Sequence, residues 1–149
     1  MRRGALIILV AIAVAGATVA EAAVTPGTYK GSVKSAGSIT LKIDSKKRLV
    51  KFVRTNIKVK CDDGTSATNS KITTTGVAPI KSDGTFVWKA DAEDVAESGH
   101  NWRLGGTVKS PNASGTLKET VRFNAAGEPD PNGSVSCTTG KLRWSAKRQ

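Results

Sequence analysis

Two cysteines and one histidine are the residues of this chain best suited to covalent or metal chemistry. In an oxidising compartment two cysteines allow a single connectivity, so we expect one intramolecular disulfide between Cys61 and Cys137. A metal site usually needs about four ligands, and His100 is the only histidine that could join the two sulfurs. The residue types therefore favour a structural cross-link over a metal centre or a catalytic thiol.

No group of residues in the sequence is suited to nucleophilic or acid–base catalysis. A general base needs a fixed neighbour and a nucleophile within reach, and the sequence indicates neither for His100. We expect His100 to be an exposed loop imidazole at the start of a strand. Because no nucleophile, base and orienting group can be named together, we predict no enzymatic activity, no catalytic residue and no cofactor.

Four carboxylates fall within a short segment, at Asp91, Glu93, Asp94 and Glu97. Their oxygens could bind calcium, but the spacing lacks the central glycine of a calcium loop. A glycosidase carboxylate pair would need a cleft lined with aromatic residues, which are few here. We therefore expect a solvated acidic segment over 92–97, either one turn of helix or a loop, and no metal.

Lysine and arginine give the chain its strongest charge signal. The 23 basic and 12 acidic residues give a net charge of +11. Many basic residues alternate with apolar ones, which places them on the outer faces of strands, where they attract polyanions. The candidate polyanion-binding residues are Lys42, Lys46, Lys47, Arg48, Lys58, Lys60 and Arg143.

The kind of partner follows from what accompanies these cations. Exposed aromatic residues between them, which would indicate nucleic-acid binding, are missing. We therefore expect an anionic polysaccharide, a wall polymer or an anionic membrane surface. The same cation pattern is also typical of strands whose lysines only keep a protein soluble and block edge pairing.

The tryptophans and one glutamate share the apolar positions of their strands. Trp88, Trp102 and Trp144 are in phase with apolar neighbours, so we expect them in the core and not on a stacking platform. Glu119 interrupts the apolar phase of the run 117–123. Because a buried glutamate costs several kcal/mol unless it is paired or reaches water, Glu119 either lines a polar internal pocket or is exposed by a phase slip.

The elements that would position these residues are β-strands. Alternating apolar and polar residues are typical of half-buried strands, and Gly-, Asp-, Asn- and Pro-rich turns separate the runs. The third strand changes phase and needs a bulge or bend near Arg54-Thr55, and a second bend is expected at Thr139-Gly140. The pattern predicts about eight strands, near 28–34, 38–43, 49–61, 66–74, 85–91, 101–109, 114–123 and 135–147.

These strands predict one all-β domain. The connections are short, and no long amphipathic helix is available to join parallel strands. We therefore expect a single antiparallel meander that closes into a β-barrel or a two-sheet β-sandwich, two outcomes that the pattern does not separate.

The first 22 residues have the pattern of a secretory signal peptide. Two arginines precede an uncharged apolar stretch at 5–20, and the small residues Ala20 and Ala22 fit a signal-peptidase site. We expect cleavage after Ala22 and a secreted or extracytoplasmic domain at 23–149. The alternative is an uncleaved membrane anchor, for which the stretch is short.

Four short motifs follow in the rest of the chain. They are G-x-Y-x-G at 27–31, C-D-x-G at 61–64, S-G-T-L at 114–117 and C-x-x-G-x-x-x-W at 137–144. In these motifs the chain resembles small exported all-β proteins of actinobacteria and their relatives, which have no established activity. The resemblance implies the β fold and the disulfide but no catalytic residues. The acidic segment before Trp102 differs from the short Gly-rich hairpin of that family.

The sequence thus predicts a non-catalytic extracytoplasmic binding or interaction module whose basic faces contact anionic polymers at the cell surface. One alternative is a barrel that holds a small ligand in an internal pocket lined by Glu119. A second alternative is a secreted hydrolase.

Overall fold

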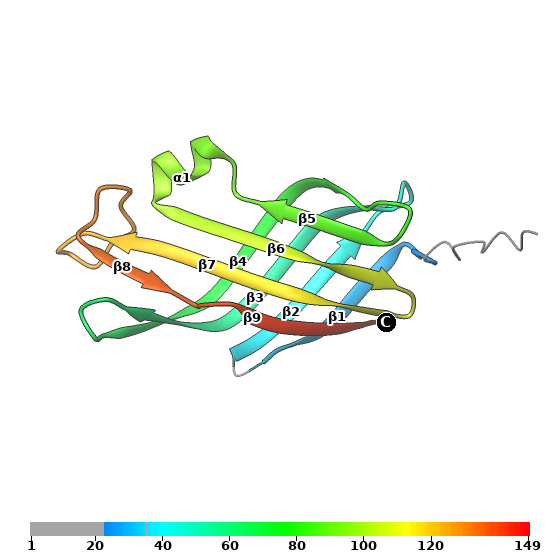
Figure 1. The fold of residues 1–149 in the computed structure, drawn as a ribbon, viewed down its shortest axis with the longest axis horizontal. Helices are drawn as coiled ribbons and strands as arrows, with labels where there is room; N and C mark the ends of the chain where they lie inside the picture. Colours follow the sequence, from blue (N-terminus) through cyan, green and yellow to red (C-terminus); the bar gives the residue numbers. More distant parts are fainter. Residues whose placement is uncertain (1–22, 35) are drawn as a thin grey trace, which may run out of the picture.

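The structure, a computed structural model, describes residues 23–34 and 36–149. The predicted signal peptide at 1–22 lies outside the described residues. Alternation of apolar and polar side chains produces strands almost throughout, which confirms the all-β prediction (Figure 1). The elements are β1 (Gly27–Val33), β2 (Ala36–Ile43), β3 (Arg48–Cys61), β4 (Ser66–Pro79), β5 (Thr85–Lys89), α1 (Ala92–Ser98), β6 (His100–Lys109), β7 (Asn112–Phe123), β8 (Val135–Thr138) and β9 (Leu142–Arg148).

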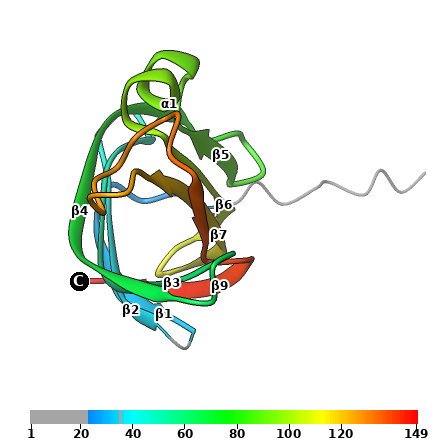
Figure 2. The same ribbon diagram turned by 90° about the vertical axis from the view of Figure 1, so that its left-hand side faces the viewer.

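The strands close into an antiparallel barrel. The sheet order is β4-β3-β2-β1-β9-β7-β6-β5, and β8 pairs with both β3 and β7. Following the pairings from β3 through β2, β1, β9, β7 and β8 leads back to β3, which makes a closed ring of six strands. The end-on view shows the strands surrounding a common interior, with α1 over one side (Figure 2). Of the two predicted outcomes, the barrel is the one observed.

Both predicted bends are observed, one within β3 and one between β8 and β9. In β3 the buried positions change from Phe52 and Arg54 to Ile57 and Val59. Between them Asn56 has a φ of 56°, a left-handed conformation that asparagine tolerates better than most residues. The bend therefore lies next to the predicted Arg54-Thr55.

The eighth predicted strand is divided in two by the second bend. Gly140 has a φ of 62°, and its N–H donates to Thr138 Oγ1 at 3.1 Å. The bend lets β8 reach β3, while β9 pairs with β1 and continues along β7. The single strand predicted at 135–147 therefore forms two strands, β8 and β9, at different positions in the ring.

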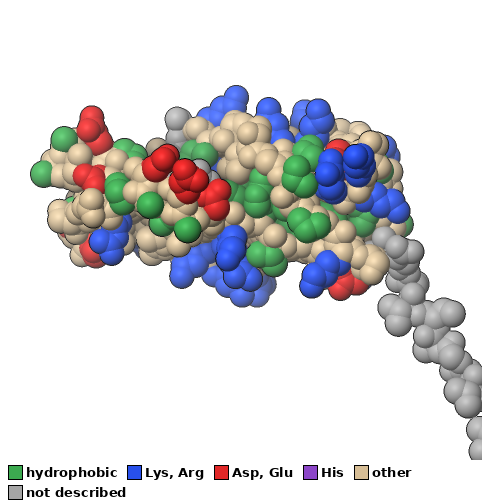
Figure 3. All heavy atoms as spheres, turned by 90° about the horizontal axis from the view of Figure 1, so that it is seen from above, with side chains coloured by type: hydrophobic (Ala, Val, Ile, Leu, Met, Phe, Trp, Pro, Cys, Tyr) green, Lys and Arg blue, Asp and Glu red, His purple; other side chains and the backbone are tan. Residues whose placement is uncertain are grey.

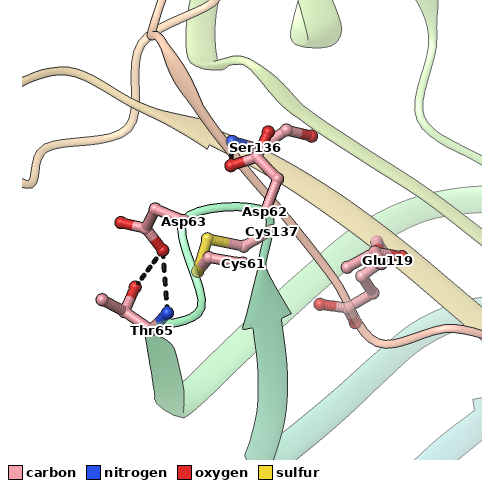
Figure 4. The surroundings of a disulfide bond; sticks show 8 residues. Cys61, Asp62, Asp63, Thr65, Glu119, Ser136 and Cys137 are labelled. Atoms are coloured by element: carbon pink, nitrogen blue, oxygen red, sulfur yellow. Dashed lines mark hydrogen bonds between the residues drawn. A yellow bond between two sulfur atoms is a disulfide. The ribbon is translucent and has the colours of Figure 1, made fainter.

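The predicted disulfide is present at the ring closure. Cys61 on β3 and Cys137 on β8 are directly paired residues with a Cα–Cα distance of 3.9 Å (Figure 4). The β3–β8 ladder contains only one further pair, Lys60 with Thr138. The covalent bond therefore reinforces the shortest ladder of the ring.

The tryptophans lie in the core, as predicted. Trp102 and Trp144 are buried, and Trp88 is half-buried against the core. Phe52 lies edge-on to both Trp88 and Trp102, with ring centroids 5.6 and 5.1 Å apart.

In the part of the chain that the structure describes, no helix is long and apolar enough to cross a membrane.

Candidate anion-binding face

The seven predicted polyanion-binding residues do not form one patch. Lys46 and Lys47 lie in the turn before β3, whereas Lys58 and Lys60 lie near its other end, roughly 35 Å along the strand. Lys42 is on β2 and Arg143 on β9, and all six of these side chains are exposed. The outward orientation of the predicted lysines is therefore observed, but their grouping is not.

Arg48, the seventh candidate, is already paired. Its Nε and Nη2 donate to Asp44 Oδ2 at 2.9 and 2.7 Å, and its backbone N–H donates to Asp44 Oδ1 at 2.8 Å. The side-chain hydrogen bond from Arg48 holds the pKa of Asp44 below its ordinary value. The charge of Arg48 is therefore less available to a ligand than that of the neighbouring lysines.

Two rows of cations lie on the outer surface of β1, β9, β7, β6 and β5, which we call the basic face; a separate facing pair, Lys42 and Lys51, lies on β2 and β3. Strand register sets the cations of the basic face in rows that run across the strands. Lys30 on β1 is opposite Lys147 on β9, Lys147 is opposite Asn112 on β7, and Asn112 is opposite Lys109 on β6. All four side chains are exposed, so this row presents three ammonium groups to solvent.

A row of hydroxyl groups lies beside the lysine row, two residues further along each strand. Because these side chains are shorter than those of the lysine row, the surface is slightly hollowed here. Hollows of about 370 and 390 Å³ share Asn112, Ala113 and Ser114 in their linings. The members of the row, each opposite the next, are Ser32, Ser145, Ser114, Thr107 and Thr85.

A second cationic row crosses the other part of the basic face. Lys89 on β5 is opposite Arg103 on β6, and Arg103 is opposite Lys118 on β7. Arg143 lies between the two cationic rows, opposite Thr116. The residues of the second row alternate with apolar ones in the sequence, but only the register reveals that they are neighbours.

No carboxylate interrupts the basic face. Glu119 is the single Asp or Glu in the five strands, and its side chain is fully buried. The exposed acidic residues Asp91, Glu93 and Glu97 belong to α1 and the residue before it. A view from above Figure 1 shows acidic side chains gathered mainly at one end and Lys and Arg along both flanks (Figure 3). The outward charges of these five strands are therefore all positive, and the nearest carboxylates lie at strand ends, as Asp83 does beside Thr85.

Arg54 and His100 both contact Glu119 in the interior of the barrel, and we call these three polar side chains the polar trio. Arg54 Nε and Glu119 Oε1 form an ion pair, and both side chains are fully buried. Arg54 Nη1 donates to Thr74 Oγ1 at 3.2 Å, and His100 Nε2 lies 3.3 Å from Glu119 Oε2. The Arg54 guanidinium also stacks on Phe52, 4.7 Å from the ring centroid. Burial lowers the pKa of Arg54, and the charge of Glu119 opposes that shift.

One of the two alternatives for Glu119, and the expectation for His100, are wrong. Glu119 is not exposed by a phase slip, because its charge is paired inside the barrel. His100 is not an exposed loop imidazole: it begins β6, and its side chain is 19% exposed. The partner that sequence reasoning missed is Arg54, whose signal was its position in phase with Phe52. Among the described residues five surface hollows are well formed, and Glu119 lines none of these five.

Within the described ranges 23–34 and 36–149, the side-chain partner of the His100 imidazole is Glu119. Among the described residues, no hydroxyl or thiol hydrogen-bonds to the His100 imidazole, so no nucleophile accompanies the His100–Glu119 pair. The described residues also contain no group of three or more His, Cys, Asp and Glu that could hold a metal ion. The acidic segment forms α1, one of its two predicted conformations.

No family model matches the chain, and searches of curated proteins and of solved structures give no match either.

Proposed function

We propose that this protein is a non-catalytic extracytoplasmic module that binds anionic polymers through the basic face. The observation that carries the proposal is the register of the cations: two rows on adjacent strands, with no outward carboxylate among the described residues of the face. A polymer with regularly spaced anionic groups can contact both rows at once. Neutralising several charges together also releases counterions, which favours binding.

The arrangement costs the folded protein stability when no ligand is bound. Like charges directly opposite on adjacent strands destabilise a sheet by tenths of a kcal/mol per pair. A surface that serves solubility alone gains from interspersed opposite charges. Lys30 faces Lys147, and Arg103 lies between Lys89 and Lys118. None of these facing pairs includes an acidic residue that would offset the repulsion. A bound polyanion would remove the repulsion.

The location of the partner follows from the expected export. The N-terminal pattern predicts secretion, and the Cys61–Cys137 disulfide is compatible with an oxidising compartment. Polymers at a cell surface that carry carboxylate, sulfate or phosphate groups are the class of partner that such a protein would meet. The shallow hydroxyl row can hydrogen-bond the sugar or linker between the anionic groups.

Retention on an immobilised anionic polysaccharide tests the proposal. The face variant replaces Lys30, Lys109 and Lys147 with glutamine, and the control replaces Lys42, Lys51 and Lys58, which lie on β2 and β3. Both variants lose the same charge. We expect the face variant to elute at clearly lower salt than the control. Equal elution of the two would show that only net charge matters and would reject the basic face.

A further inference from the structure

The second cationic row is more concentrated than the first. Lys89, Arg103 and Lys118 are consecutive partners on three adjacent strands, which lie about 4.8 Å apart. Their side chains therefore leave the sheet within about 10 Å of one another. All three are exposed, and among the described residues none has an ion-pair or side-chain hydrogen-bond partner. The row therefore has three unused cationic groups.

Neutral donors flank this row. Asn101 and Thr120 are opposite each other on β6 and β7, two residues beyond Arg103 and Lys118. The three cations and these two residues line one hollow of about 290 Å³. It is the only one of the five hollows described that three cations line without a carboxylate. The site therefore combines charge, neutral donors and a concave surface.

The donor geometry selects a kind of anion. The Arg103 guanidinium presents a planar fork that can engage two oxygens of one anion, and an ammonium acts as a point charge. A carboxylate has only two oxygens, which the fork alone can satisfy. A phosphate monoester or a sulfate ester has a third terminal oxygen, which is left for Lys89, Lys118, Asn101 and Thr120 to bind.

We propose that Lys89, Arg103 and Lys118, together with Asn101 and Thr120, form a binding site for a phosphate or sulfate group. The inference rests on the proposed function, because the group would be carried by the anionic polymer. It narrows that function: phosphorylated or sulfated polymers bind at this row, whereas purely carboxylated polymers gain only the general attraction of the basic face.

A titration with small anions tests the site without a polymer. Sodium phosphate, sodium sulfate and sodium acetate are added at matched ionic strength and pH, and amide and guanidinium NMR signals are followed. We expect saturable shifts at Lys89, Arg103 and Lys118 with phosphate or sulfate, and only small unsaturated shifts with acetate. Equal responses to all three salts would overturn the site.

Variants of the arginine separate specific recognition from charge. Arg103→Gln should weaken phosphate or sulfate binding at least about tenfold, the loss of roughly one charge-assisted hydrogen bond. Arg103→Lys keeps the charge but not the fork, so it should recover only part of the affinity. Lys42→Gln is the matched control and should leave the titration unchanged. Binding by Arg103→Gln at the wild-type level would overturn the proposal.

The two proposals can fail separately. If Arg103→Gln keeps wild-type retention on a sulfated and on a phosphorylated polymer while the face variant loses it, the site is rejected and the proposed function stands. If the wild-type protein binds no anionic polymer, the proposed function fails, and the small-anion titration still decides the site. The comparison of methyl sulfate, methyl phosphate and dimethyl phosphate identifies which ester the site prefers.

Discussion

Arg54 on β3 and Glu119 on β7 form an ion pair with both side chains fully buried. The backbone of Glu119 also fixes the bend between β8 and β9, because its carbonyl accepts from Thr139 N and Thr138 Oγ1, each at 3.0 Å. Its own N–H donates to Thr139 Oγ1 at 2.9 Å. One residue therefore holds both the interior charge and the bend that lets β8 reach β3 at the disulfide. Figure 4 shows Glu119 and the disulfide in one view.

Breaking the ion pair should destabilise the barrel strongly. Glu119→Leu leaves the Arg54 guanidinium buried without its counter-charge, which typically costs about 3–5 kcal/mol. Adding Arg54→Met should recover most of that loss, since a buried pair replaced by apolar side chains is often neutral. Urea unfolding of both variants measures the effect. A single variant as stable as the wild type would mean that the pair is not needed.

Removing the disulfide should lower the free energy of unfolding substantially. The bond closes a loop with a sequence separation of 76 residues, and the chain-entropy model gives about 4–5 kcal/mol for a loop of this size. Cys61→Ala with Cys137→Ala tests this by urea unfolding. An unfolding midpoint equal to that of the wild type would contradict the role of this bond in closing the ring.

A pair of glycine substitutions tests the packing beneath the basic face. A Cβ at Gly115 would overlap the carbonyl of Gly105 and the Cα of Gly106, whereas a Cβ at Gly105 would come no closer than 3.7 Å to Phe86 O. We expect Gly115→Ala to fold poorly and Gly105→Ala to lose at most about 0.5 kcal/mol, as ordinary surface changes do. Thermal unfolding compares them, and equal stability would contradict the close strand approach.

Stability should fall at acidic pH because three turn carboxylates are held ionised. The Thr85 hydroxyl and amide lower the pKa of Asp83, Thr65 does the same for Asp63, and Arg48 for Asp44. A folded pKa below the unfolded one gives stability that is present above the ordinary value of 3.8 and is lost as pH falls through the folded pKa.

The acid transition can be assigned with one substitution. Asp83→Asn removes one of the titrating groups, so its free energy of unfolding should fall less steeply between about pH 5 and 2 than that of the wild type. Ser82→Ala, in the same turn, removes no titrating group and is the control, which should keep the wild-type slope. A variant slope identical to the wild-type slope would show that Asp83 does not contribute.

Local patterns in the sequence predicted most of the fold. Alternation and turn residues predicted the strands, the phase change predicted the bend now seen at Asn56, and the cysteine count predicted the disulfide. The choice of a barrel depended on the pairing of β3 with β8, which are far apart in the chain. No local pattern reports such a pairing.

The candidate site was less predictable for the same reason. Each lysine could be assigned to an outer face, but β9 pairs between β1 and β7, so Lys147 becomes a neighbour of Lys30 only in the folded chain. Likewise, Arg54 and Glu119 each occupy an apolar phase, and only the closed ring shows that they meet. Export and the resemblance to exported actinobacterial proteins stay predictions.

The salt dependence of polymer binding tests the central claim most directly. Calorimetry at several salt concentrations gives the slope of log affinity against log salt for the wild type and for the variant with glutamine at Lys30, Lys109 and Lys147. We predict steep weakening with salt for the wild type, and a slope smaller by about one for each lysine removed. Wild-type binding that does not change with salt, or equal slopes for the two proteins, would contradict recognition of anionic polymers by the basic face.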